Sequence, residues 1–84
     1  MKIFYTSRAR KEVRKLEREL SQRIHADIGL LAKNPYPHGS QKLEDEEGYR
    51  IRIGNYRVIY VVDKKNKEIT IMRIRHRKEA YKRF

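Results

Sequence analysis

The stretch GYRIRIGNYRVIY, residues 48–60, decides the fold of this chain. Apolar or aromatic residues alternate with arginine up to Gly54-Asn55, and a second run of mostly apolar and aromatic residues follows. Alternation with a period of two is typical of a strand with one buried face, and Gly-Asn between two such runs indicates a two-residue hairpin turn. The sequence therefore predicts an antiparallel hairpin in which Arg52 lies directly opposite Arg57.

The chain before this hairpin predicts a short strand at residues 2–5, two amphipathic helices and a polar loop at residues 36–47. Apolar residues at spacings of three and four form one helix face, and they are Ala9, Val13, Leu16 and Leu20, then Ile24, Ile28 and Leu31. We expect Ser7 and Ser21 to cap the two helices at their N-termini. Asn34-Pro35 should end the second helix, because a residue before proline disfavours the helical conformation.

The chain after the hairpin predicts a lysine-rich turn, a last strand at residues 69–74 and a basic tail at residues 75–84 with a short helical turn. The order strand, helix, helix, strand, strand, strand indicates an α+β fold of two layers. The N-terminal strand and a helical hairpin pack on one face of an antiparallel sheet. A chain of 84 residues and 10.2 kDa makes a single domain, residues 1–84.

The composition favours a nucleic-acid partner and excludes several other classes. The formal charge is +11 and the sequence pI is near 10.2, which is typical of nucleic-acid-binding domains. There is no cysteine, so disulfides and thiolate chemistry are excluded, and the three histidines show no metal-binding spacing. The apolar runs are too short for a membrane helix or a signal peptide. We expect a cytoplasmic protein without a metal, a small-molecule cofactor or a membrane partner.

The hairpin register places Arg50, Arg52 and Arg57 on one face of the sheet. Like charges directly opposite one another destabilise a hairpin, so an anionic ligand explains this cluster better than stability does. Charge is added at the end of the last strand by Arg73, Arg75, His76 and Arg77, and a helical tail would place Tyr81 beside Arg77.

These residues predict a site for a phosphate and an unpaired base, about the size of a dinucleotide. Two points stay open from the sequence. The length of the lysine-rich turn leaves undecided which of the last arginines shares the face of Arg57. The arginines can also belong to a solvated sheet face, with the tyrosines serving as packing groups.

The stretch at residues 48–60 resembles the core motif of the RelE/ParE toxin superfamily, and it is closer to RelE. Asn34-Pro35, residues 41–43 (QKL) and residues 75–81 (RHRKEAY) match the same family in order and spacing, so the resemblance covers nearly the whole chain. The family's fold has the element order predicted above. The resemblance implies the toxin of a type II toxin–antitoxin pair. RelE-type members cut mRNA in the ribosomal A site, whereas ParE-type members inhibit DNA gyrase.

Position by position, the resemblance implies that Arg57 clamps the scissile phosphate, that Arg77 or Arg75 acts as general acid, and that Tyr81 orients the substrate. Arg50 and Arg52 match a basic pair that is often lysine in RelE-type enzymes. Arginine is a poor general base, so the base stays unassigned, with His76 in reserve. The expected catalytic residues are Arg52, Arg57, Arg77 and Tyr81, and the expected RNA-binding residues are Arg50, Arg73, Arg75, His76 and Lys42.

The resemblance also implies the partners. We expect an acidic, partly disordered antitoxin that wraps the basic surface and folds on binding, together with the ribosome and its mRNA. The expected reaction is attack of a 2′-hydroxyl on the adjacent phosphate without a metal. The alternative is a gyrase inhibitor or a catalytically inactive binding module.

Overall fold

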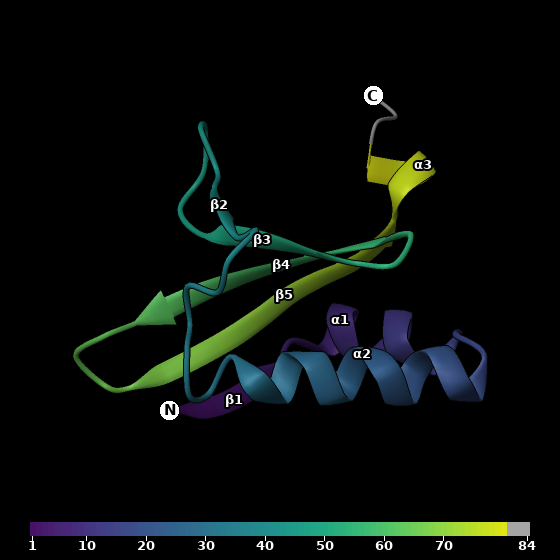
Figure 1. The fold of residues 1–84 in the computed structure, drawn as a ribbon, viewed down its shortest axis with the longest axis horizontal. Coiled ribbons are helices and arrows are strands. Elements are labelled where there is room, and N and C mark those ends of the chain that lie inside the picture. The colour runs from purple at the N-terminus through teal and green to yellow at the C-terminus, as the bar shows by residue number, and fades with distance from the viewer. Residues whose placement is uncertain (81–84) are drawn as a thin grey trace.

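The computed structural model describes residues 1–80, which form a sheet covered on one face by two helices (Figure 1). The elements in chain order are β1 (Lys2–Tyr5), α1 (Ser7–Arg14), α2 (Arg18–Leu30), β2 (Gln41–Lys42), β3 (Tyr49–Ile53), β4 (Tyr56–Asp63), β5 (Glu68–His76) and α3 (Arg77–Ala80). The predicted two-layer α+β architecture is confirmed. The strand β2 is an addition, and it lies within the stretch expected to be a loop.

The sheet has five strands in the order β1-β5-β4-β3-β2. All neighbouring pairs are antiparallel except β1 and β5, which run parallel. The sheet is therefore mixed and not wholly antiparallel as expected. The path of the chain through the two helices decides whether β1 runs parallel or antiparallel to β5. The alternation within a four-residue strand carries no information about this direction.

Both helices begin at other residues than predicted. Thr6, not Ser7, caps α1: its Oγ1 accepts a hydrogen bond from the backbone N–H of Ala9 at 3.1 Å. Glu17 precedes α2 without a side-chain cap, so Ser21 lies inside that helix. The reason is that the apolar spacing continues across the turn between the helices, where Leu16 packs on the core without being helical.

The core lies between the helices and the sheet, and its fully buried side chains include Ile24, Ile28, Val58, Tyr60, Ile69 and Ile71. The hydroxyl of Tyr60 donates to the backbone oxygen of Pro35 at 2.7 Å, and burial raises the pKa of this tyrosine. Tyr60 thus ties the loop after α2 to the sheet, and Tyr49 stacks on it at 6.0 Å between ring centroids. These tyrosines are packing groups. None of the described helices is long and apolar enough to cross a membrane.

The register of the hairpin is confirmed, with Arg52 opposite Arg57. Between β4 and β5 the register shifts by one residue, because Tyr60 faces Ile71 whereas Ile59 faces Arg73. Met72 is the extra residue of this β-bulge. Without it Arg57 would face Ile74, so the bulge decides the face on which the last arginines lie.

Candidate functional site

A row of three arginines crosses the central strands on the face away from the helices. Arg52 of β3 lies opposite Arg57 of β4, and Arg57 lies opposite Arg75 of β5. Adjacent strands are about 4.8 Å apart, so the three side chains start close together. Three like charges in register destabilise a sheet. The row is therefore the candidate for the anion-binding surface that the sequence predicts.

Arg77 joins this row from the first turn of α3. Its backbone N–H donates to the carbonyl oxygen of Asn55 at 2.7 Å, which holds the start of α3 against the turn between β3 and β4. Gly54 makes that turn with a φ of 59°, in the region that favours glycine. Arg52, Arg57 and Arg77 line one shallow depression together with the turn. The structure thus brings together the three expected catalytic residues that lie within residues 1–80.

His76 lies beside this depression and has a defined hydrogen-bonding role. Its ring packs edge-on against Tyr56 at 5.2 Å between centroids, and its Nδ1 accepts the backbone N–H of Lys78 at 3.2 Å. An imidazole that accepts at Nδ1 and is neutral has its proton on Nε2. With Nδ1 occupied by this backbone N–H, Nε2 is the ring nitrogen left for other contacts, and the reserve role of general base stays a prediction. Among the side chains that the structure describes, no three metal-ligating groups lie together so that they could hold an ion.

Arg73 has a different position from the other arginines of β5. Its Nε and Nη2 donate to the carboxylate of Glu12 on α1, with the ion pair at 2.9 Å. The same carboxylate accepts the backbone N–H of Ile74 at 2.9 Å, so α1 covers the edge of β5 beyond the end of β1. The guanidinium of Arg73 therefore points toward α1 and away from the arginine row.

The remaining expected site residues are spread along the sheet. Arg50 lies two positions before Arg52 on the same face and donates to the side chain of Gln41. Lys42 lies opposite Tyr49, on the side of the sheet that faces the helices, and is not brought to the arginine row. Tyr81 lies outside the described residues.

Sequence reasoning missed two residues of this region. Asn55 lines the depression and positions Arg77, although it was read only as part of a turn. Glu12 of α1 is the second, because it holds Arg73 against the helix. The Gly54-Asn55 turn could have indicated Asn55, because this turn lies at the same end of the sheet as the pair Arg52 and Arg57. No local signal pairs Glu12 with a residue 61 positions away.

Comparisons with known proteins identify the family of this chain. A family model described as "ParE toxin of type II toxin-antitoxin system, parDE" matches residues 3–81. Toxin RelG of Mycobacterium tuberculosis is 30% identical over 83 residues, which cover 96% of this chain and 95% of RelG.

Solved structures show the same fold. A chain of the toxin–antitoxin complex RelBE2 of Mycobacterium tuberculosis superposes with a TM-score of 0.80 at 25% identity, covering 90% of this chain and 96% of that one. A chain of the archaeal RelE–RelB complex of Pyrococcus horikoshii gives 0.77 at 26% identity, covering 90% and 93%. Because the family model matches nearly the whole chain, and a close-length relative shares nearly a third of its residues, the chain belongs to the RelE/ParE family of type II toxin–antitoxin toxins.

Proposed function

We propose that this toxin cuts mRNA on the ribosome by attack of a 2′-hydroxyl on the neighbouring phosphate. The observation that carries the proposal is the convergence of Arg52, Arg57 and Arg77 on one depression at the end of the sheet. A guanidinium group stays charged at every physiological pH and can donate to two phosphate oxygens at once. Three of them on the open sheet face suit the backbone of a single RNA strand.

In the proposed reaction the 2′-oxygen forms a bond to phosphorus and the bond from phosphorus to the 5′-oxygen breaks. The products are a 2′,3′-cyclic phosphate and a 5′-hydroxyl. Arg52 and Arg57 bind the non-bridging oxygens and stabilise the charge that develops on them, and Arg77 supports the leaving 5′-oxygen. Fixed charges of this kind act mainly by orientation and by electrostatic stabilisation of the transition state.

The proposed site has no assigned strong base for the proton transfers. We therefore expect cleavage to depend on the ribosome. The 2′-hydroxyl loses a proton and the 5′-oxygen gains one. Among the side chains that the structure describes, those of residues 1–78, no carboxylate lines either the arginine depression or the one beside His76. A site without a strong base is slow on free RNA, and it gains most from a substrate that another molecule holds in line.

The same proposal assigns the remaining partners. Tyr81, by resemblance to the family, stacks on a base next to the cut. An acidic antitoxin neutralises the +11 chain and folds as it wraps around it. The solved relatives from Mycobacterium tuberculosis and Pyrococcus horikoshii are toxin–antitoxin complexes, which supports a partner of this kind. A toxin that acts on ribosomes works in the cytoplasm.

The test is to supply the purified protein to translating ribosomes and to map the 5′ ends of the message. We expect new ends that depend on ribosomes and that disappear in the double variant Arg57→Ala/Arg77→Ala. A matched control is Lys2→Gln/Lys65→Gln, which removes two exposed charges near the turn between β4 and β5, at the opposite end of β5 from Arg77. Full growth arrest by the double arginine variant would contradict the nuclease proposal.

A second candidate function is inhibition of DNA gyrase, and the ParE description of the matching family model favours it. This function needs no phosphate-binding triad. A supercoiling assay with purified gyrase separates the two candidates. Inhibition that persists in the double arginine variant, with intact mRNA, would support the gyrase inhibitor.

A further inference from the structure

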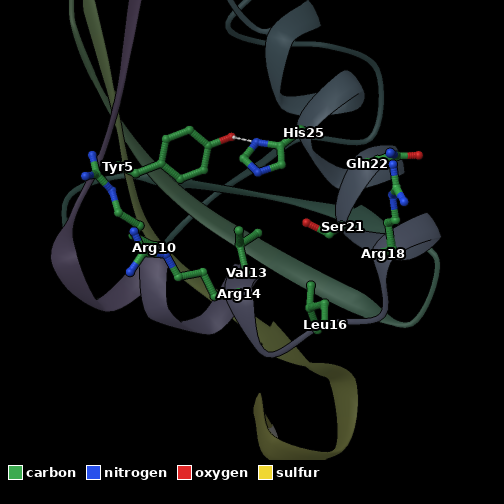
Figure 2. A pocket seen from close by; sticks show the side chains of 9 residues that line it. All are labelled: Tyr5, Arg10, Val13, Arg14, Leu16, Arg18, Ser21, Gln22 and His25. Atoms are coloured by element: carbon green, nitrogen blue, oxygen red, sulfur yellow. Dashed lines mark hydrogen bonds between the residues drawn. The ribbon is translucent and has the colours of Figure 1, made fainter.

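A hollow of about 400 Å³ lies in the helix layer, between the end of β1 and the two helices (Figure 2). The sheet separates it from the arginine row, because the helices cover only the other face (Figure 1). Its volume is within the range of ordinary small-ligand sites. It is therefore a second concave surface, distinct from the proposed cleavage site.

Three arginines surround this hollow. Figure 2 shows Arg10 and Arg14 coming from α1 on the side of Tyr5, and Arg18 coming from α2 on the opposite side. Like charges four residues apart on a helix are destabilising, so the pair Arg10 and Arg14 does not stabilise α1. Among the described residues that line the hollow there is no carboxylate. The hollow is thus a concentrated cationic site.

The interior of the hollow combines an apolar floor with hydrogen-bonding groups. Val13 and Leu16 supply the floor, and the hydroxyl of Tyr5 is hydrogen-bonded to Nδ1 of His25 at 2.8 Å across one wall. The two rings lie 5.3 Å apart. Ser21 and Gln22 add a hydroxyl and an amide from α2. Aromatic walls, amide groups and arginines together are the means by which proteins hold an unpaired RNA base and its phosphate.

We propose that this hollow binds one unpaired nucleotide of an RNA strand. The phosphate lies on Arg10 and Arg14, and the base lies against the wall made by Tyr5 and His25. The inference rests on the proposed function, because a toxin bound to the ribosome would contact structured RNA with its helix side while the arginine row holds the message. The volume and the polar wall favour a nucleotide over an acidic amphipathic helix, which needs a longer apolar groove.

The test maps backbone amide shifts by NMR while a short single-stranded RNA is added to the full chain. We expect the backbone amide shifts of Tyr5, Ser21, Gln22 and His25 to change as RNA is added. The RNA affinity obtained from these changes should be about tenfold weaker in the variant Arg10→Gln/Arg14→Gln. The matched control is Arg8→Gln/Lys11→Gln, which removes two charges from the same helix at exposed positions that do not line the hollow. The control should retain the affinity to within about twofold.

A second variant keeps this inference separate from the cleavage proposal. Arg52→Gln/Arg57→Gln should lose mRNA cleavage and still show RNA-dependent shifts in the hollow. Unmoved amides in the hollow, or equal weakening in the Arg8→Gln/Lys11→Gln control, would overturn the inference. It would also be overturned if a glutamate-rich helical peptide moved these amides while RNA did not. Failure of the intact protein to cut mRNA, with the hollow shifts retained, would overturn only the cleavage proposal.

Discussion

The two faces of the sheet are made by alternate residues of the same strands, and they differ in chemistry. Toward the helices, Ile53 is 3% exposed and Val58 is fully buried. On the other face their neighbours are Arg52 and Arg57, opposite each other in register. Burial of apolar area stabilises the first face, whereas the second places like charges side by side.

From this difference we expect strand alternation to separate the residues that stabilise the sheet from those of the proposed cleavage site. A substitution on the helix side should change the free energy of unfolding, and one in the arginine row should change the reaction. Arg73 differs from the arginines of the row. It lies on the same strand as Arg75, but its side chain pairs with Glu12 on α1. The predictions below follow this comparison from the largest effect to the smallest.

Ile71→Ala should have the largest effect on stability. The side chain of Ile71 is fully buried between β5 and the helices, and truncation of such a residue costs about 2–5 kcal/mol. Urea unfolding followed by circular dichroism measures the loss. Ile59→Ala is the matched control, because Ile59 is half-buried on the opposite face. Equal losses in the two variants would contradict the assignment of the core to one face.

Arg57→Ala should reduce the rate of mRNA cleavage by about 10²–10³, which corresponds to about 2–4 kcal/mol of transition-state stabilisation. The variant should still unfold cooperatively, because Arg57 lies on the face away from the core. Single-turnover cleavage on programmed ribosomes measures the rate. Arg57→Lys keeps the charge but loses the two-pronged geometry, so an intermediate rate is expected. A wild-type rate in Arg57→Ala would remove this residue from the proposed site.

Arg73→Ala should reverse this pattern. It removes a half-buried partner of Glu12 and should lower the free energy of unfolding by about 1–2 kcal/mol. Cleavage on ribosomes should be unchanged, because the guanidinium points to α1. Glu12→Gln should cost less, since its side-chain oxygen can still accept the N–H of Ile74. A cleavage defect in Arg73→Ala as large as that of Arg57→Ala would place Arg73 in the arginine row.

Thr6→Ala should have the smallest effect, a loss of about 1 kcal/mol in the free energy of unfolding. The hydroxyl of Thr6 caps α1 and also donates to the backbone oxygen of Met72 at 3.0 Å. Thr6→Ser keeps the hydroxyl and should be nearly neutral. Ser7→Ala tests the position expected from the sequence, and a larger loss there than in Thr6→Ala would contradict the observed cap. Denaturant midpoints of the three variants settle the order.

The sequence by itself determined the local features of this protein. The alternation and the Gly54-Asn55 turn predicted both central strands and the pairing of Arg52 with Arg57, because register within a tight hairpin depends only on the turn. The net charge and the arginine spacing favour an anion-binding face, which stays a prediction. The apolar stripe predicted two helices but not where the chain turns between them, since a spacing of three and four continues through a short turn.

Only the tertiary structure decided what depends on distant contacts. The bulge at Met72 sets the face on which Arg75 lies, and neither the strand nor the lysine-rich turn encodes it. The parallel pairing of β1, the contact of Glu12 with Arg73 and the placement of Arg77 against the carbonyl of Asn55 each join segments that are far apart in the chain. Such contacts form only when the layers pack, because each depends on where the rest of the fold places its partner.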